Sequence, residues 1–142
     1  MARILVTTLA DSVEAQPGSK FYIAGGGLDG LTVPAFPFLF GRLSVAIVLA
    51  LAEGERRIPL STDLIDPSGK TLVHIDSQID RERAEPAEIW FGIAFPPIQM
   101  GMAGPYRVVS HSGESEHTRV LVVTGETGNA IRVPMPVSGS MN

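Results

Sequence analysis

The sequence predicts an all-β fold, an antiparallel β-sandwich of Ig-like or jelly-roll type with about eight strands. In residues 43–52, the most apolar run, bulky side chains alternate with mostly smaller ones. This period of two is typical of a strand, whose side chains point to opposite faces in turn. Glycine and proline also interrupt the chain at short intervals, and we find no convincing amphipathic helix.

The first half of the chain supplies three expected strands. Residues 4–9 and 21–24 flank a Gln-Pro-Gly-Ser turn signal and are expected to form a hairpin. Residues 43–52 are apolar on both faces, which indicates a central strand. Residues 34–40 are rich in proline and phenylalanine, so we expect an extended connection that caps one end of the core.

Three consecutive glycines, residues 25–27, follow the second expected strand. A phosphate-binding loop would need a helix directly after them. Gly30 and Pro34 come too soon for a helix to form. These glycines therefore predict a bulge or a tight crossover, where the backbone takes angles that other residues tolerate poorly.

The second half supplies two hairpins and a strand between them. Residues 58–66 and 71–80 flank an Asp-Pro-Ser-Gly β-turn, and residues 106–111 and 117–124 flank a short loop. Residues 88–95 place two isoleucines and two phenylalanines on one face. We expect that face to meet the bulky side of residues 43–52 from the opposing sheet. The smaller side of that central strand should lie under the C-terminal arm or a second subunit.

The chain divides into a sandwich domain, residues 1–124, and an extended C-terminal arm, residues 125–142. The arm is rich in Gly, Pro and Ser, yet apolar residues alternate along it. This alternation favours docking as an added strand or in a groove, on its own sandwich or on a neighbouring subunit. The alternating residues are Ile131, Val133, Met135 and Val137.

Several segments together resemble a bacterial family of small proteins of unknown function. The segments are Leu-Ala-Asp-Ser-Val at residues 9–13, Lys-Phe-Tyr-Ile-Ala-Gly-Gly-Gly at 20–27, Phe-Pro-Pro-Ile at 95–98 and Gly-Pro-Tyr-Arg-Val at 104–108. The resemblance spans most of residues 4–123. It implies a β-sandwich, and it carries over no catalytic residue because no activity is established for the family.

Composition excludes several classes of function. Eleven Lys and Arg against fifteen Asp and Glu, without a large basic cluster, argue against nucleic-acid binding. The apolar run at residues 43–52 is about half the length that a membrane helix needs, so no membrane association is expected. The absence of cysteine excludes a disulfide framework and thiolate metal sites. The N-terminus is a poor signal peptide, and we expect a cytoplasmic protein.

The residues that could carry catalysis do not form a recognisable motif. His111 and His117 are candidate metal ligands, but they share a face of their hairpin only if the loop between them has an odd number of residues. No serine lies in a nucleophile motif, and the paired carboxylates on residues 71–80 lack a desolvating partner. We therefore expect no cofactor and no catalytic residue, and lean against an enzyme.

The aromatic residues offer candidate binding positions. Trp90 lies opposite the core-facing side chains of its strand, where it could pack under a loop, contact a subunit or bind a ligand. Phe36 and Phe38 could contribute to a ligand platform. The main hypothesis is a non-enzymatic sandwich that binds a partner protein or itself, as a homo-oligomer. The alternatives are a small-ligand or carbohydrate-binding jelly roll and a metal-dependent jelly-roll enzyme.

Overall fold

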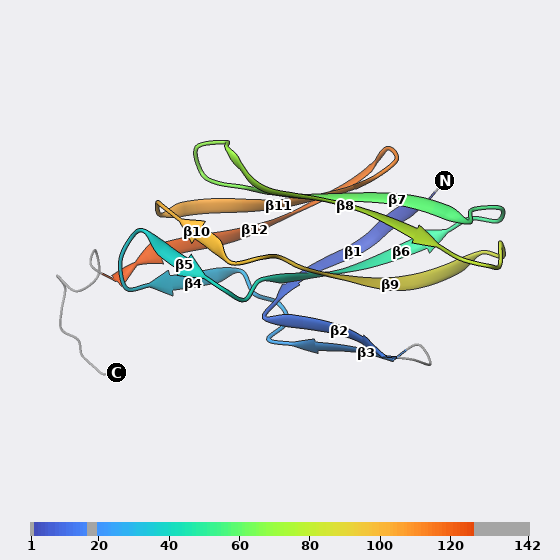
Figure 1. The fold of residues 1–142 in the computed structure, drawn as a ribbon, viewed down its shortest axis with the longest axis horizontal. Coiled ribbons are helices and arrows are strands. Elements are labelled where there is room, and N and C mark those ends of the chain that lie inside the picture. The colour runs from blue at the N-terminus through green and yellow to red at the C-terminus, as the bar shows by residue number, and fades with distance from the viewer. Residues whose placement is uncertain (1, 17–19, 127–142) are drawn as a thin grey trace.

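The computed structural model describes residues 2–16 and 20–126, which form two packed β-sheets and two smaller strand pairs (Figure 1). One sheet has the order β1-β6-β9 and the other β4-β12-β11-β7-β8, while β2 pairs with β3 and β5 with β10. The all-β sandwich expected from the sequence is confirmed. In chain order the strands are β1 (Arg3–Ala10), β2 (Ser12–Gln16), β3 (Lys20–Ala24), β4 (Gly30–Val33), β5 (Phe38–Phe40), β6 (Ser44–Leu51), β7 (Arg57–Ile65), β8 (Thr71–Asp80), β9 (Ala87–Ala94), β10 (Ile98–Met100), β11 (Gly104–Ser112) and β12 (Ser115–Gly125).

The most apolar run forms β6, the central strand of the three-stranded sheet, as predicted. Its bulky residues face the core, and Val45, Ile47 and Leu49 are fully buried. The expectation for residues 88–95 was wrong in its placement. They form β9, which is hydrogen-bonded to β6 in the same sheet, with Ile93 beside Val45. Alternation sets which face a residue occupies but not which strand lies beside it, because pairing depends on distant segments.

The smaller side of β6 is buried as well. Ala46 is 2% exposed and Val48 6%, although both point away from the core. Among the described residues, β2 contacts both β6 and β9 on this side. Strand β2 therefore packs next to the smaller side of β6. Cover by the arm or by a second subunit stays a prediction. The arm itself, from residue 127 onward, lies outside the described residues.

The N-terminal hairpin differs from the expected one. Residues 4–9 fall within β1, which pairs with β6, whereas the partner of β3 is β2. Strands β1 and β2 are separated at Asp11. The N–H of Asp11 donates to the carbonyl of Ala24 at 3.0 Å and closes the base of the hairpin of β2 and β3. Short pairings between distant segments were also missed. In particular β4 pairs with β12 in parallel, and β5 pairs with β10.

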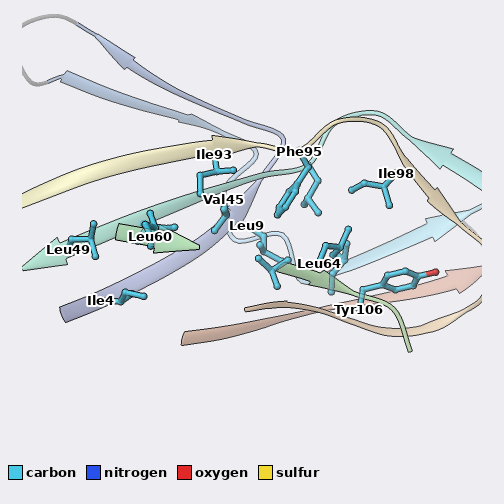
Figure 2. Close-up of a cluster of buried hydrophobic side chains, with 14 of the residues drawn as sticks. Ile4, Leu9, Val45, Leu49, Leu60, Leu64, Ile93, Phe95, Ile98 and Tyr106 are labelled. Carbon is cyan, nitrogen blue, oxygen red and sulfur yellow. The ribbon is translucent and has the colours of Figure 1, made fainter. Parts of the chain in front are cut away.

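One continuous core fills the space between the two sheets. Figure 2 shows Leu60 and Leu64 of β7 and Tyr106 of β11 in the same cluster as Val45 of β6 and Ile93 of β9. The Tyr106 side chain is buried, and its hydroxyl donates to the carbonyl of Met102 at 2.7 Å. A buried phenol needs such a partner.

The turn between β7 and β8 forms as its sequence predicts. Oδ1 of Asp66 accepts hydrogen bonds from the N–H of Ser68 at 2.9 Å and from the N–H of Lys70 at 2.9 Å. Gly69 has a φ of 93°, which side chains other than glycine rarely allow. The hydrogen bond from the Ser68 hydroxyl is the main cause that lowers the pKa of Asp66.

None of the described residues forms a helix that is long and apolar enough to cross a membrane.

Candidate functional site

The register of the hairpin of β11 and β12 does not bring His111 and His117 together as a pair of metal ligands. Ser112 faces Ser115 across a two-residue loop, so His111 faces Glu116 and His117 faces Ser110. The two histidines therefore point to opposite faces of the sheet, and they do not meet. No group of three or more potential metal-ligating side chains occurs within residues 2–16 and 20–126.

A Ser-His-Glu row nevertheless crosses the outer face of the five-stranded sheet, and the sequence analysis missed it. His111 lies between Ser61 of β7 and Glu116 of β12, and its Nδ1 is 3.3 Å from a Glu116 oxygen. Ser61 and His111 line a shallow hollow of about 320 Å³ with Asp76. Ser61 is far from His111 in sequence, and only the pairing of β7 with β11 brings them together.

This row lacks the rest of a hydrolase site. Acyl transfer needs a nucleophile hydrogen-bonded to its base and N–H donors for the oxyanion. No hydrogen bond joins Ser61 to His111 in the described part of the chain. Both β7 and β11 lie inside the sheet, paired on both sides, so their N–H groups near Ser61 are engaged in the ladder. The row presents polar side chains to solvent, and the neighbouring backbone N–H groups of β7 and β11 are not available as an oxyanion hole.

His74 forms the centre of a second polar cluster on the same face. Its ring nitrogens contact the carboxylates of Asp63 and Asp76, the second at 3.1 Å. These two carboxylates raise the pKa of His74, and the hydrogen bond with Asp63 is the largest cause. The ring is half exposed, so the cluster is a surface ion pair that joins β7 to β8.

The candidate aromatic residues do not form one platform. Trp90 is 51% exposed on the outer face of β9, in a row with Val48 and Val6. Phe36 and Phe38 are partly buried against the core, and β5, which contains Phe38, lies toward the opposite end of the molecule from the middle of β9 (Figure 1). The convergence that a ligand platform of Trp90, Phe36 and Phe38 would need is therefore not observed.

A groove of about 470 Å³ lies between β1 and β12. Polar contacts bridge the two strands here. Nε of Arg119 donates to the carbonyl of Thr7 at 2.7 Å, and the N–H of Ile4 donates to the Ser115 hydroxyl at 2.9 Å. These contacts occupy backbone groups at the outer edge of β1, so this side of the sandwich is closed by side chains.

The opposite side, between β8 and β9, remains open. Inward-facing apolar residues of the inner strands are fully buried, as Leu60 and Leu64 of β7 show. The corresponding residues of β8 and β9 pack against the core but stay partly exposed, and they are Val73, Ile75, Ile79, Ile89 and Phe91. No strand pairing joins β8 to β9 among the described residues. The sandwich therefore presents two strand edges and an apolar row on one side.

The four edge strands of the two sheets differ in how they are protected. The edge of β1 is hydrogen-bonded to β12, as described above. The strand β4 spans only Gly30–Val33 and is followed by Pro34, and β8 carries His74, Asp76 and a register shift near Leu64. Short length, charge, proline and bulges all block the addition of further strands.

Strand β9 differs from these three in its length, its regular register and its low charge. Its eight residues, AEIWFGIA, include one charged side chain and no proline or lysine. They pair with β6 in one unbroken register from Leu51–Ala87 to Ser44–Ala94. Among the described residues β9 is the last strand of its sheet, and a regular apolar strand in that position is the arrangement that accepts another strand. The sequence signal was the near absence of charge in residues 87–94.

The comparison with protein families agrees with this architecture. A model of a family of unknown function, DUF6941, matches residues 5–124, which extends from β1 almost to the end of β12. The chain belongs to the DUF6941 family. The resemblance inferred from the sequence to an uncharacterised family is thus confirmed. No curated protein matches the chain, so the function has to be argued from the DUF6941 domain itself.

Proposed function

We propose that this DUF6941 protein is a non-catalytic association domain, which binds a protein strand along β9 at the open side of the sandwich and forms homo-oligomers in this way. The single observation that carries the proposal is the partly exposed apolar row of β8 and β9, which no strand among the described residues covers.

The energetic argument rests on the partly exposed apolar row. A strand added outside β9 would lie opposite β8, because the two sheets face each other about 10 Å apart. Its inward side chains would cover Ile89 and Phe91 of β9 and the inward residues of β8. Backbone hydrogen bonds along the edge would give the register, and burial of these side chains would supply most of the free energy.

A charged residue on the edge tests the proposal. Ile89→Lys places an ammonium group on the inward face of β9, where an added strand would bury it. Val122→Lys is the matched control, since Val122 is 47% exposed on the outer face of β12. Sedimentation velocity from about 1 to 100 µM covers the range of micromolar affinities.

We expect the unmodified chain and Val122→Lys to associate over this range, and Ile89→Lys to remain monomeric with an unchanged circular dichroism spectrum. A monomeric unmodified chain at the highest concentration would contradict the proposal. So would association of Ile89→Lys equal to that of Val122→Lys.

The cytoplasmic location expected from the sequence stands as part of this proposal. Fractionation of cells that produce the full chain with a small epitope tag provides the test, with recovery in the cytoplasmic fraction as the expected result.

A further inference from the structure

The groove between β1 and β12 is lined by three separate segments of the chain, which are residues 7–9, 27–29 and 118–120. Backbone hydrogen bonds hold the middle segment, a loop, against both strands. The N–H of Leu28 donates to the carbonyl of Leu9 at 3.0 Å, and the N–H of Val122 donates to the carbonyl of Asp29 at 3.0 Å. The groove therefore has fixed walls, and its volume of about 470 Å³ falls within the range of small-molecule sites.

The last of the three consecutive glycines, Gly27, belongs to this lining. Its φ is 78°, a conformation that favours glycine, and a Cβ added there would meet no atom within 4 Å. The sequence analysis assigned these glycines only a role in the path of the backbone. At Gly27 the lack of a side chain also leaves open space beside the loop.

Arg119 contributes a guanidinium group that is held in place before any ligand binds. Its Nε donates to the carbonyl of Thr7 at 2.7 Å, which ties the planar group to β1. Among the described residues, no hydrogen bond or ion pair engages its two terminal nitrogens. Two parallel N–H groups of this kind match the two oxygens of a carboxylate. Arg119 is therefore suited to bind a carboxylate in the groove.

Asp29 contributes the opposite charge from the loop. It lines the same groove, and within residues 2–16 and 20–126 no ion pair joins it to Arg119 or to another cation. The groove thus contains one positive and one negative side chain that do not neutralise each other. A simple anion would be attracted by Arg119 and repelled by Asp29. A zwitterion carries both charges and complements both groups.

The groove also offers groups for the rest of a ligand. Thr7 lines it and is 2% exposed, and its Oγ1 has no hydrogen-bond partner in the described part of the chain. Buried hydroxyls are nearly always paired, so this hydroxyl is a candidate partner for a bound polar group. Leu28 and Val120 add apolar surface to the lining.

We propose that this groove binds a free α-amino acid with an apolar side chain. The carboxylate of the amino acid accepts hydrogen bonds from the terminal nitrogens of Arg119, its ammonium group pairs with Asp29, and its side chain lies against Leu28 and Val120. This site is separate from the association surface, because the order β1-β6-β9 places β1 and β9 at opposite ends of their sheet.

An NMR titration of the full-length protein with L-leucine tests the site. The signals to follow are the backbone amides of residues 27–29 and the Nε–H of Arg119, and leucine up to about 20 mM covers millimolar affinities. We expect these signals to shift and to saturate. L-Leucinamide lacks the carboxylate, and 4-methylpentanoate lacks the ammonium group. Each of these analogues should bind at least about tenfold more weakly than leucine.

Two variants assign the charges to residues. Arg119→Gln should weaken leucine binding at least about tenfold, whereas Arg83→Gln, on an exposed arginine between β8 and β9, is the matched control and should bind like the unmodified chain. Asp29→Asn keeps the size of the side chain and the backbone contact with Val122, so it tests the site even if Arg119→Gln does not fold. It should weaken the binding of leucine and should not weaken that of 4-methylpentanoate.

The absence of a saturating shift with leucine would overturn the inference. Leucinamide or 4-methylpentanoate that binds as tightly as leucine would do the same, because the site would then not recognise a zwitterion. Equal leucine affinity in Asp29→Asn and the unmodified chain would also contradict it. None of these results bears on association at β9, which sedimentation velocity measures separately.

Discussion

Because one side of the sandwich is open, we expect Ile89→Ala and Ile93→Ala to lower the unfolding free energy by different amounts. Ile89 and Ile93 lie on the same strand and the same inward face, opposite Leu49 and Val45 of β6. Ile93 is 6% exposed, whereas Ile89 is only partly buried. Replacing each with alanine removes the same three carbon atoms, so a difference in unfolding free energy reports the difference in burial.

The magnitudes follow from the transfer and cavity contributions. Three buried carbon atoms are worth about 2.4 kcal/mol at roughly 0.8 kcal/mol each. A cavity in the packed core raises the cost of Ile93→Ala to about 3–4 kcal/mol. Water already reaches part of Ile89 and no closed cavity remains there, so we expect about 1–1.5 kcal/mol for Ile89→Ala. With a urea dependence near 1.5 kcal/mol/M, the midpoints should fall by about 2 M and about 1 M.

Urea unfolding at about 1 µM, where the copies are separated, measures both values. At about 100 µM the added strand covers Ile89, and the cost of Ile89→Ala should rise toward that of Ile93→Ala. Equal costs in the separated chain would refute the reasoning, because they would show that the β8 and β9 side is already closed.

Two further predictions concern individual groups. Tyr106→Phe should lower the unfolding free energy by about 1 kcal/mol, since the carbonyl of Met102 loses its donor; an unchanged urea midpoint would contradict this. The pKa of His74 is raised above its ordinary value of 6.5 by Asp63 and Asp76, so its contribution to stability is complete below pH 6.5 and is lost as pH rises through the folded pKa. The difference in urea midpoint between the unmodified chain and His74→Gln should therefore shrink to zero with rising pH, and a constant difference would contradict the assignment.

The long strands could be predicted from the sequence because the alternation of side chains that defines each of them lies within one continuous segment. Residues 43–52 and 71–80 alternate over enough positions to determine the strand and its faces, and Asp66 with Gly69 determines the turn before the second of them. The short strands β4, β5 and β10 escaped detection because pairing with distant segments stabilises them.

The candidate site depended on distant pairings that local patterns do not contain. A two-residue loop placed His111 opposite Glu116, and the pairing of β7 with β11 added Ser61 to the same row. Similarly, residues 88–95 were predicted as a strand, but the position of β9 at the end of a sheet follows from its pairing with β6 alone. An edge is a property of the sheet, so only the assembled topology reveals it.

Amide hydrogen exchange of β9, followed by NMR in the full-length protein, tests the central claim most directly. Half of the amides of β9 face β6 and the other half face away from it. If a second copy adds a strand, the amides that face away from β6 should exchange more slowly at about 100 µM than at about 1 µM, and Ile89→Lys should abolish this difference. Equal exchange of these amides at both concentrations would contradict strand addition at β9.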